Sequence, residues 1–408
     1  FVSINKKIAS PLEYQCTWVP NTGYFKVNSF YTNNFYLDRF KAHLNEFFLI
    51  SSLSDYRLLN LKKKYLKNKK KLIISWFTKN DFSKNLIYKD KYIPIRPNNN
   101  TIYFLLNVGK FFDPKKLKNK NLILYQKEKE KNFNFFFLIK SVLNFFLSKK
   151  YKVSSLSVYS VFAHQVTDKI METLDNNDFK EIILPYEAQP FQKLLISKVR
   201  QKYKKIKFIS YLSAMQPFPI HLHDHSIIPD MNYAVSPAQI MQLTKIFSWN
   251  KKKVKLIKAH RFDINLVHKY KNKIVLPYFI NGKRKIYDNL FKLINSKPKN
   301  FFSQISLAPH PAGLYDKSYM KFVKSLESMI VKFDYKFDKK IIKNQSIIIG
   351  STSTIFEALE YGLEVFHIVN EPLLESLDYL FWPTIKISNF NDNVFIYRTK
   401  YKKKLINY

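Results

Sequence analysis

The most constraining feature of this sequence is the stretch Ser346–Phe366, which changes from a strand pattern to a helix pattern and back. The β-branched run Ile347–Ile349 predicts a buried strand, and the apolar spacing within Ile355–Leu359 predicts a helix. Gly362 marks the end of that helix, and an apolar run follows it. A chain with this pattern is expected to form a βαβ unit, which requires a parallel sheet.

Four consecutive hydroxyl residues lie between the predicted strand and helix: Ser351, Thr352, Ser353 and Thr354. The first turn of a helix exposes backbone N–H groups and the positive end of the helix dipole. Hydroxyls at this position add donors, so the turn is a candidate site for a phosphate group. The alternative is that they only cap the helix. This stretch alone leaves both interpretations open.

Strand and helix patterns alternate along much of the chain, which predicts an α/β protein with parallel sheets. The 408 residues are enough for two domains, and we place them at residues 1–255 and 256–408. Leu44–Leu59 is interpreted as a helix and Lys251–Asp263 as a basic connector. The main strand candidates are Leu72–Phe77, Ile102–Leu106, Glu181–Pro185, Lys207–Leu212, Ile274–Phe279 and Gln304–Ala308. The main helix candidates are Phe133–Leu147, Val158–Leu174, Phe191–Tyr203, Pro237–Phe247, Ile286–Ile294 and Ser318–Phe333.

A second polar feature, His310-Pro311, follows the predicted strand that ends at Ala308. Ligands of open α/β sheets bind at the carboxyl ends of strands. We therefore expect His310 to lie on the same rim as the hydroxyl turn. An imidazole there can donate a hydrogen bond to a phosphate oxygen, and the flanking prolines stiffen the backbone.

These motifs resemble those of a known group of enzymes. His310-Pro311 followed by the hydroxyl turn resembles the HP and S-S/T pair of bacterial sialyltransferases and related Kdo and capsule-type transferases. The run Glu357–Leu359 with Gly362 resembles a helix common in GT-B nucleotide domains, and Tyr186–Gln192 resembles a stretch of surface-carbohydrate biosynthesis proteins. The resemblance covers roughly residues 150–370.

The resemblance implies a GT-B enzyme with two Rossmann-like domains facing a cleft. It further implies inverting transfer of an acidic sugar, a sialic acid-like nonulosonate or Kdo, from a CMP-sugar to a glycan or glycolipid acceptor. Such an enzyme is bacterial and cytoplasmic and uses neither a cofactor nor a metal. The alternatives are a CDP-glycerol glycerophosphotransferase, a nucleotide-sugar 2-epimerase, and a non-enzymatic RNA- or membrane-binding protein.

Roles for single residues also follow from the resemblance. His310 and Pro311 would meet the nucleotide phosphate with Ser351, Thr352, Ser353 and Thr354. Glu357 would accept hydrogen bonds from the ribose, or, as the alternative, only pair with the helix dipole. Lys283–Lys285 could bracket the nucleotide or the sugar carboxylate, although a solvated basic loop is the more ordinary interpretation.

The expected general base is Glu187, which follows the strand candidate Glu181–Pro185. An inverting transfer needs one carboxylate or histidine within hydrogen-bond reach of the acceptor hydroxyl. The alternative is that Glu187 caps the next helix.

The segment His221–His225 contains three histidines and an aspartate, which could bind a metal ion. We expect no metal there and assign His221 and His223 to the acceptor side.

The net charge of +39 suggests an anionic partner, but we expect no nucleic acid. Lysine greatly outnumbers arginine, the basic runs are scattered, and the composition is that of an AT-rich genome. No apolar run is long enough to cross a membrane. Phe133–Leu147 is expected to be a buried helix, with an interfacial helix as the alternative. The excess charge and this stretch leave room for peripheral contact with the anionic inner face of the membrane. The single cysteine, Cys16, excludes an internal disulfide framework.

Overall fold

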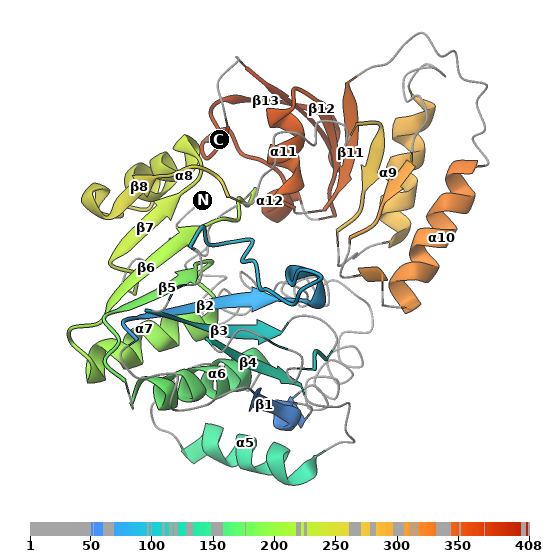
Figure 1. Cartoon of the computed structure of the whole chain (residues 1–408). Coiled ribbons are helices and arrows are strands. Elements are labelled where there is room, and N and C mark those ends of the chain that lie inside the picture. The colour runs from blue at the N-terminus through green and yellow to red at the C-terminus, as the bar shows by residue number, and fades with distance from the viewer. Residues whose placement is uncertain are drawn as a thin grey trace. The chain divides into compact units, whose positions relative to one another are not determined.

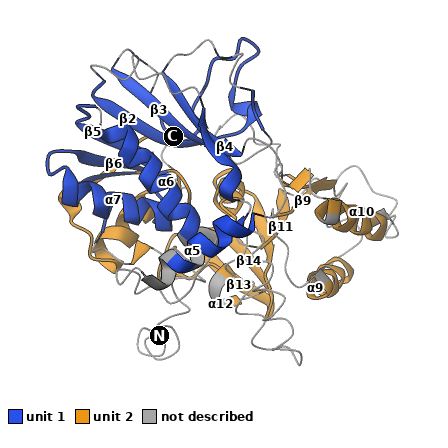
Figure 2. Ribbon diagram, turned by 90° about the horizontal axis from the view of Figure 1, so that it is seen from below, with its two compact units in different colours: residues 1–212, 224–233 blue, residues 213–223, 234–408 orange. Residues whose placement is uncertain are grey.

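The protein is seen in a computed structural model that contains two compact units (Figures 1 and 2). One unit comprises residues 1–212 and 224–233, and the other comprises residues 213–223 and 234–408. The structure describes residues 50–51, 53–59, 69–95, 98, 100–107, 111–113, 117, 121–127, 134–147, 158–175, 177–217, 222–223, 227–260, 271–277, 283–296, 306–310, 313–314, 317–331, 344–350, 352–370, 372–400 and 405–406.

The first sheet has eight strands in the order β1-β4-β3-β2-β5-β6-β7-β8. Strands β4, β3, β2, β5 and β6 are parallel, and β1 is antiparallel to β4. The strands are β1 (Tyr56–Leu59), β2 (Lys71–Phe77), β3 (Thr101–Asn107), β4 (Leu122–Lys127), β5 (Glu181–Pro185), β6 (Lys207–Leu212), β7 (Met231–Ala234) and β8 (Val254–Leu256).

The parallel part of this sheet has the strand order of a dinucleotide-binding fold. From β2 the chain adds β3 and β4 on one side, then returns to add β5 and β6 on the other. The direction of winding therefore reverses between β2 and β5. In open α/β sheets, ligands bind at the carboxyl ends of the two strands at this point.

The two faces of the first sheet are covered differently. Alternate side chains of a strand point to opposite faces, so Trp76 and Phe77 of β2 diverge. Trp76 meets Phe191 of helix α7 (Pro190–Lys202) edge to face at 5.6 Å. Phe77 is buried on the other face among the rings of Phe82 and Phe112. Helix α6 (Val158–Leu174) packs beside α7 through a hydrogen bond between Thr167 and the Phe191 carbonyl.

The second sheet has six strands in the order β10-β9-β11-β12-β14-β13. The first four are parallel, and β14 and β13 form an antiparallel hairpin against β12. The winding direction reverses between β9 and β11. The strands are β9 (Lys273–Val275), β10 (Ser306–Ala308), β11 (Gln345–Ile349), β12 (Glu364–Ile368), β13 (Ile385–Asn391) and β14 (Val394–Thr399).

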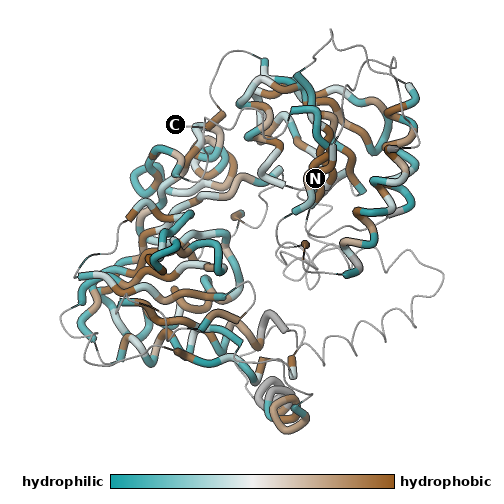
Figure 3. Tube along the Cα trace, turned by 45° about the vertical axis from the view of Figure 1, so that its right-hand side comes forward, coloured by the Kyte–Doolittle hydropathy of each residue, from teal (hydrophilic) through white to brown (hydrophobic). Residues whose placement is uncertain are grey.

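Helices cover both faces of the second sheet. Helices α9 (Lys283–Asn295) and α10 (Lys317–Val331) share one core with Ile347 and Ile349 of β11. Helix α11 (Thr354–Glu360) packs on the other face and buries Phe356 against Trp382 at 4.1 Å between ring centroids. The middle of each sheet is mainly hydrophobic (Figure 3). This arrangement is that of a Rossmann-like domain.

Residues 213–223 belong to the second unit, and polar contacts connect Pro217 and Gln242 of this unit to its carboxyl-terminal part. The indole N–H of Trp382 donates to the Pro217 carbonyl at 2.9 Å, and Trp382 is fully buried. The carboxamide of Gln242 donates to the Phe381 carbonyl at 2.8 Å. Gln242 begins the π-helix Gln242–Ile246, which follows α8 (Pro237–Met241).

The predicted α/β class with two Rossmann-like halves is confirmed, as are the principal strands and helices. The prediction of a helix through Leu59 is wrong at its end, because residues 56–59 form β1 and pair with β4. Strands β4 and β8 and the β13–β14 hairpin were not foreseen. The domain boundary at residue 255 stays a prediction. Among the helices of the described ranges, none combines the length and apolarity that a membrane crossing requires.

We expect Trp382→Phe to lower the free energy of unfolding of the second unit by about 2–3 kcal/mol, because the buried Pro217 carbonyl loses its donor and a cavity remains. Urea unfolding monitored by circular dichroism measures the change. The matched control is Trp76→Phe, a half-buried indole of the first sheet. A cost below about 0.5 kcal/mol would show that the Trp382 contact is not stabilising.

Candidate functional site

Three parallel strands of the second sheet end side by side and bring the predicted residues to one edge. Ala308 of β10 and Ile348 of β11 are both in register with Val275 of β9. His310 therefore follows β10, and Gly350 follows β11, at the same carboxyl edge. Neighbouring strands lie about 5 Å apart, so these two strand ends are about 10 Å apart with β9 between them.

The turn after β11 depends on glycine. Gly350 has φ +68°, a left-handed conformation that other residues adopt only with strain. Its N–H donates to the Ile368 carbonyl at 2.9 Å. A Cβ at Gly350 would lie 3.2 Å from Cγ of Pro277, which follows β9. The two strand ends at the point of reversal are therefore packed directly against each other.

A buried histidine forms a hydrogen bond with the backbone of this turn. His367 of β12 is fully buried, and its Nε2 lies 2.8 Å from the Gly350 carbonyl oxygen. Its Nδ1 lies 3.2 Å from the Tyr397 hydroxyl, which accepts a hydrogen bond from the Leu377 N–H at 3.0 Å. Because a carbonyl only accepts, Nε2 carries the proton and Nδ1 accepts from Tyr397. Burial lowers the pKa of His367 to about 4, so the imidazole is neutral near pH 7.

The hydroxyl turn leads directly into α11. Ser353 occupies the N-cap position, but its side chain makes no capping hydrogen bond. Thr352 Oγ1 accepts from the Thr354 N–H at 3.3 Å and donates to Thr354 Oγ1 at 3.1 Å. Among the described hydroxyl residues 352–354, Thr352 is the one whose side chain accepts a hydrogen bond from a backbone N–H. Ser351 lies outside the described residues.

Glu357 lies in the first turn of α11. Its neighbours Phe356 and Ala358 are buried, whereas Glu357 is only half-buried. The carboxylate therefore belongs to the more exposed side of the helix, near its amino-terminal end.

A basic helix start lies across the end of β11. Lys285 is in the first turn of α9, which follows β9, and its Nζ donates to the Asn370 carbonyl at 3.0 Å. Asn370 follows β12, and its N–H donates to the buried Glu375 carboxylate at 2.8 Å. Because β11 lies between β9 and β12, this contact spans the strand that carries Gly350. Residues 283–285 are helical, which corrects their interpretation as a loop.

The turn that carries His310 is held by α10. The His310 N–H donates to the Tyr319 hydroxyl at 2.8 Å, and the His310 carbonyl accepts from Gly313 at 2.9 Å. A Cβ at Gly313 would lie 2.5 Å from Tyr319 Cε1, so a side chain there would displace the Tyr319 ring. The backbone is thus fixed while the His310 residue is exposed. Pro311 lies outside the described residues.

In the first unit, Glu187 follows β5 at the point of reversal of that sheet, on a tightly bonded turn. The Gln192 carboxamide accepts from the N–H groups of Glu187 and Gln189, both at 3.0 Å, and donates to the Pro185 carbonyl at 2.6 Å. Ala188 has φ +52°, a strained conformation for a residue with a Cβ.

The side chain of Glu187 is oriented by its own turn. Its Oε2 accepts from the Gln189 carboxamide at 3.2 Å. The N-cap of α7 is Gln189, so the helix does not use Glu187 as its cap. The other motif side chains support the turn, since Tyr186 is buried and donates to the Ile227 carbonyl at 3.1 Å.

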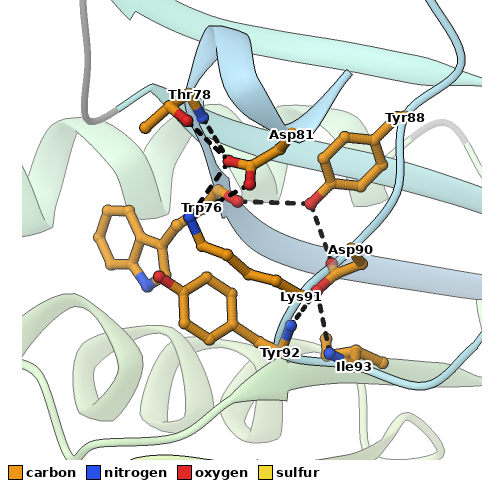
Figure 4. Close-up of polar contacts among 8 residues, drawn as sticks. All are labelled: Trp76, Thr78, Asp81, Tyr88, Asp90, Lys91, Tyr92 and Ile93. Carbon is orange, nitrogen blue, oxygen red and sulfur yellow. Dashed lines mark hydrogen bonds and ion pairs between the residues drawn. The ribbon is translucent and has the colours of Figure 1, made fainter. Parts of the chain in front are cut away.

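A second polar cluster, which sequence reasoning missed, follows β2, the strand that pairs with β5 (Figure 4). Asp81 accepts from the Thr78 N–H at 2.7 Å and pairs with Lys91 at 3.2 Å. Asp90 is buried, and desolvation raises its pKa despite several hydrogen bonds to its carboxylate. The donors to Asp90 are the N–H groups of Tyr92 at 2.7 Å and Ile93 at 2.9 Å and the Tyr88 hydroxyl at 3.0 Å. The sequence feature that could have indicated this cluster is the pair Asp81 and Asp90 after a predicted strand. Both carboxylates stabilise their own loop.

The histidine segment 221–225 lies mostly outside the described residues. His223 is exposed, and its ring meets Phe247 edge to face at 5.9 Å. His221, Asp224 and His225 are not described. Within the described part of the chain, no group of three or more His, Cys, Asp or Glu residues is placed to hold a metal ion.

Comparison with protein-family models found no match, and comparison with curated proteins found none either. Among solved structures, the chain is similar to the crystal structure of a glycosyltransferase from Rickettsia africae ESF-5. The identity is 14%, the TM-score is 0.32, and the match covers 74% of this chain and 79% of that one.

We expect Gly350→Ala to destabilise the second unit more than Gly362→Ala. Both glycines have positive φ, but a Cβ at Gly362 meets nothing within 4 Å, whereas one at Gly350 meets Pro277. Gly362→Ala should cost about 1–2 kcal/mol from backbone strain alone. Gly350→Ala should cost at least about 1 kcal/mol more. Urea midpoints measure both, and equal costs would refute the close packing of the two strand ends.

The lowered pKa of His367 predicts a pH dependence of stability. In the unfolded chain the imidazole of His367 has a pKa of 6.5 and takes up a proton below that pH. In the folded protein its pKa is about 4, so it takes up the proton only near pH 4. The contribution of His367 to the free energy of unfolding is therefore fully present above pH 6.5. It falls by about 3 kcal/mol as the pH falls to 4. His164, whose pKa burial and the charge of Lys198 also lower to about 4, adds a smaller share because it is only half-buried.

Urea unfolding between pH 4 and 7.5 measures this loss. His367→Gln should remove most of the pH dependence, and the matched control His164→Gln should remove less. An unchanged profile in His367→Gln would show that His367 is not the group responsible.

Proposed function

We propose that this chain is a glycosyltransferase that moves an acidic sugar, a sialic acid-like nonulosonate or Kdo, from a CMP-sugar to a surface-glycan acceptor. The observation that carries the proposal is the carboxyl edge of the second sheet. At the point of strand reversal this edge combines the Gly350 turn, the hydroxyls of Thr352–Thr354 and the basic start of α9. The winding rule makes this edge the expected ligand site.

The charges at this edge support the proposed donor class. A CMP-sugar of this type carries two separate anions, the phosphodiester and the sugar carboxylate. The hydroxyl turn supplies neutral donors for a phosphate. Arg284 and Lys285, both exposed on the first turn of α9, supply positive charge for the second anion. A donor with an uncharged sugar would offer no second anion to Arg284 and Lys285.

The proposed chemistry is a direct displacement. The acceptor hydroxyl oxygen forms a bond to the anomeric carbon as the bond from that carbon to the CMP phosphate oxygen breaks, and the configuration inverts. The hydroxyl proton passes to the Glu187 carboxylate, which Gln189 orients. The charge on the departing phosphate is stabilised by His310 and the hydroxyl turn, and Glu357 accepts from the ribose.

A thermal-shift panel of CMP, CDP, UDP and GDP tests the donor class. A ligand that binds only the folded protein raises its melting temperature, so a CMP-selective shift is expected. Release of CMP from CMP-sialic acid or CMP-Kdo then tests the reaction. Selectivity for CDP with turnover of CDP-glycerol would instead identify a glycerophosphotransferase, and no response to any nucleotide would refute the proposal.

Substitutions separate binding from chemistry. Glu187→Gln should lower kcat at least about 100-fold and leave the CMP shift intact, because it removes only the base. His310→Ala should weaken the CMP shift. The controls are Glu172→Gln, an exposed glutamate of α6 paired with Lys169, and His260→Ala, an exposed histidine of the second unit. Near-normal turnover by Glu187→Gln would exclude it as the base.

A further inference from the structure

Helix α5 (Phe135–Leu147) turns a row of large apolar side chains outward. The exposed fractions are 85% for Phe136, 58% for Phe135, 51% for Leu143 and 39% for Ile139. Because successive helix residues are about 100° apart, these four lie within an arc of roughly 100°. We call them the α5 stripe. Figure 1 shows α5 at the edge of the first unit.

The helix is anchored by its opposite side and its beginning. Leu138 is 9% exposed and points away from the stripe. The Asn134 side chain accepts from the Phe137 N–H at 2.9 Å, and the Asn134 N–H donates to Ser51. The expectation of a buried helix is therefore wrong for the stripe. Four large apolar side chains on one exposed helix face indicate a binding surface.

The sequence from residue 131 to residue 167, which contains α5, carries only positive charge, although Glu128 and Glu130 precede it; of its lysines, Lys140 alone lies in a described range. Between residues 131 and 167 the chain has five lysines, Lys131, Lys140, Lys149, Lys150 and Lys152, and no acidic residue. Lys140 is exposed and lies about 40° beyond Phe136 on the helix surface, at the edge of the stripe. A lysine there can lay its methylene stem along an apolar layer and keep its ammonium at the surface.

We propose that α5 docks in the interface of an anionic lipid bilayer, with the α5 stripe among the acyl chains and Lys140 at the headgroups. Helices that bind anionic bilayers combine exposed apolar side chains with basic residues. Thirteen helical residues extend about 20 Å, too short to cross the hydrocarbon core, so the helix lies in the interface. Docking would bring the chain to the surface where glycolipids are held, but it does not depend on the proposed function.

Lipid accounts for the stripe better than two other occupants. A second copy of the chain would need about 800 Å² of buried surface per partner, more than four partly exposed side chains on one helix provide. An RNA would use the lysines but gain nothing from the aliphatic Ile139 and Leu143, since single strands bind through charge and aromatic stacking.

Co-sedimentation of the full chain with vesicles tests the proposal. Binding is expected to vesicles containing phosphatidylserine, and to be at least about tenfold weaker for pure phosphatidylcholine. The double variant Phe136→Ser/Leu143→Ser should lose about tenfold or more in partitioning to the anionic vesicles. The matched control is Leu380→Ser, since Leu380 is 55% exposed and lies in the second unit. Thermal unfolding must be unchanged in both variants.

A fluorescent substitution locates the contact. Phe136→Trp should show a blue-shifted indole emission with anionic vesicles and quenching by brominated acyl chains. Sedimentation without that blue shift would mean that scattered lysines bind the lipid, and would overturn the proposal. So would self-association without lipid that the double variant abolishes, or RNA binding that outcompetes the vesicles and depends on the same two residues.

Discussion

The hydrogen bond between His367 and the Gly350 carbonyl fixes the part of the structure on which the candidate site depends. Gly350 leaves β11 in a left-handed conformation, and its carbonyl turns inward to the imidazole. Tyr397 and the Leu377 N–H complete the chain of donors, so each buried polar group in it has a partner. A turn held in this way places the hydroxyls after it on a rigid support, which an anion site needs because donors that must reorganise lose part of their binding energy.

Each sheet has a well-bonded turn after a strand at the point where its winding reverses. Each has a strand end whose backbone departs from the sheet and needs partners. In the second sheet His367 and Pro277 hold the turn; in the first, Gln192 holds three backbone groups around Glu187. The strained Ala188 persists there because these bonds fix its neighbours. Support of this kind is what allows a single carboxylate to keep one orientation.

The sequence predicted most of the elements that have a regular apolar pattern, although the buried strand β4 was missed despite its apolar run Leu122–Tyr125. The βαβ unit around Gly350 was found because buried strand, turn and helix each leave their own pattern. Strands β13 and β14 were missed because most of their side chains are only partly buried, which blurs the alternation. Glu187, His310 and the hydroxyl turn were found as strand-end residues. His367 was not: a polar residue inside the buried strand Glu364–Ile368 was its only signal, and its partner Tyr397 is distant in the chain.

The net charge of +39 can be related to single surfaces once the contacts of the carboxylates are known. Several acidic side chains of the described residues stabilise backbone groups: Asp90 at Tyr92 and Ile93, Glu375 at Asn370, and Glu360 at Leu405. The 69 lysines and arginines outnumber the 30 aspartates and glutamates, so much of the basic excess has no acidic counterpart. At the start of α9, Arg284 and Lys285 lie near the end of β11, and on α5 the exposed Lys140 lies at the edge of the apolar stripe. The two surfaces that we propose therefore draw on the same lysine-rich composition, and each depends on the side chains of its own helix.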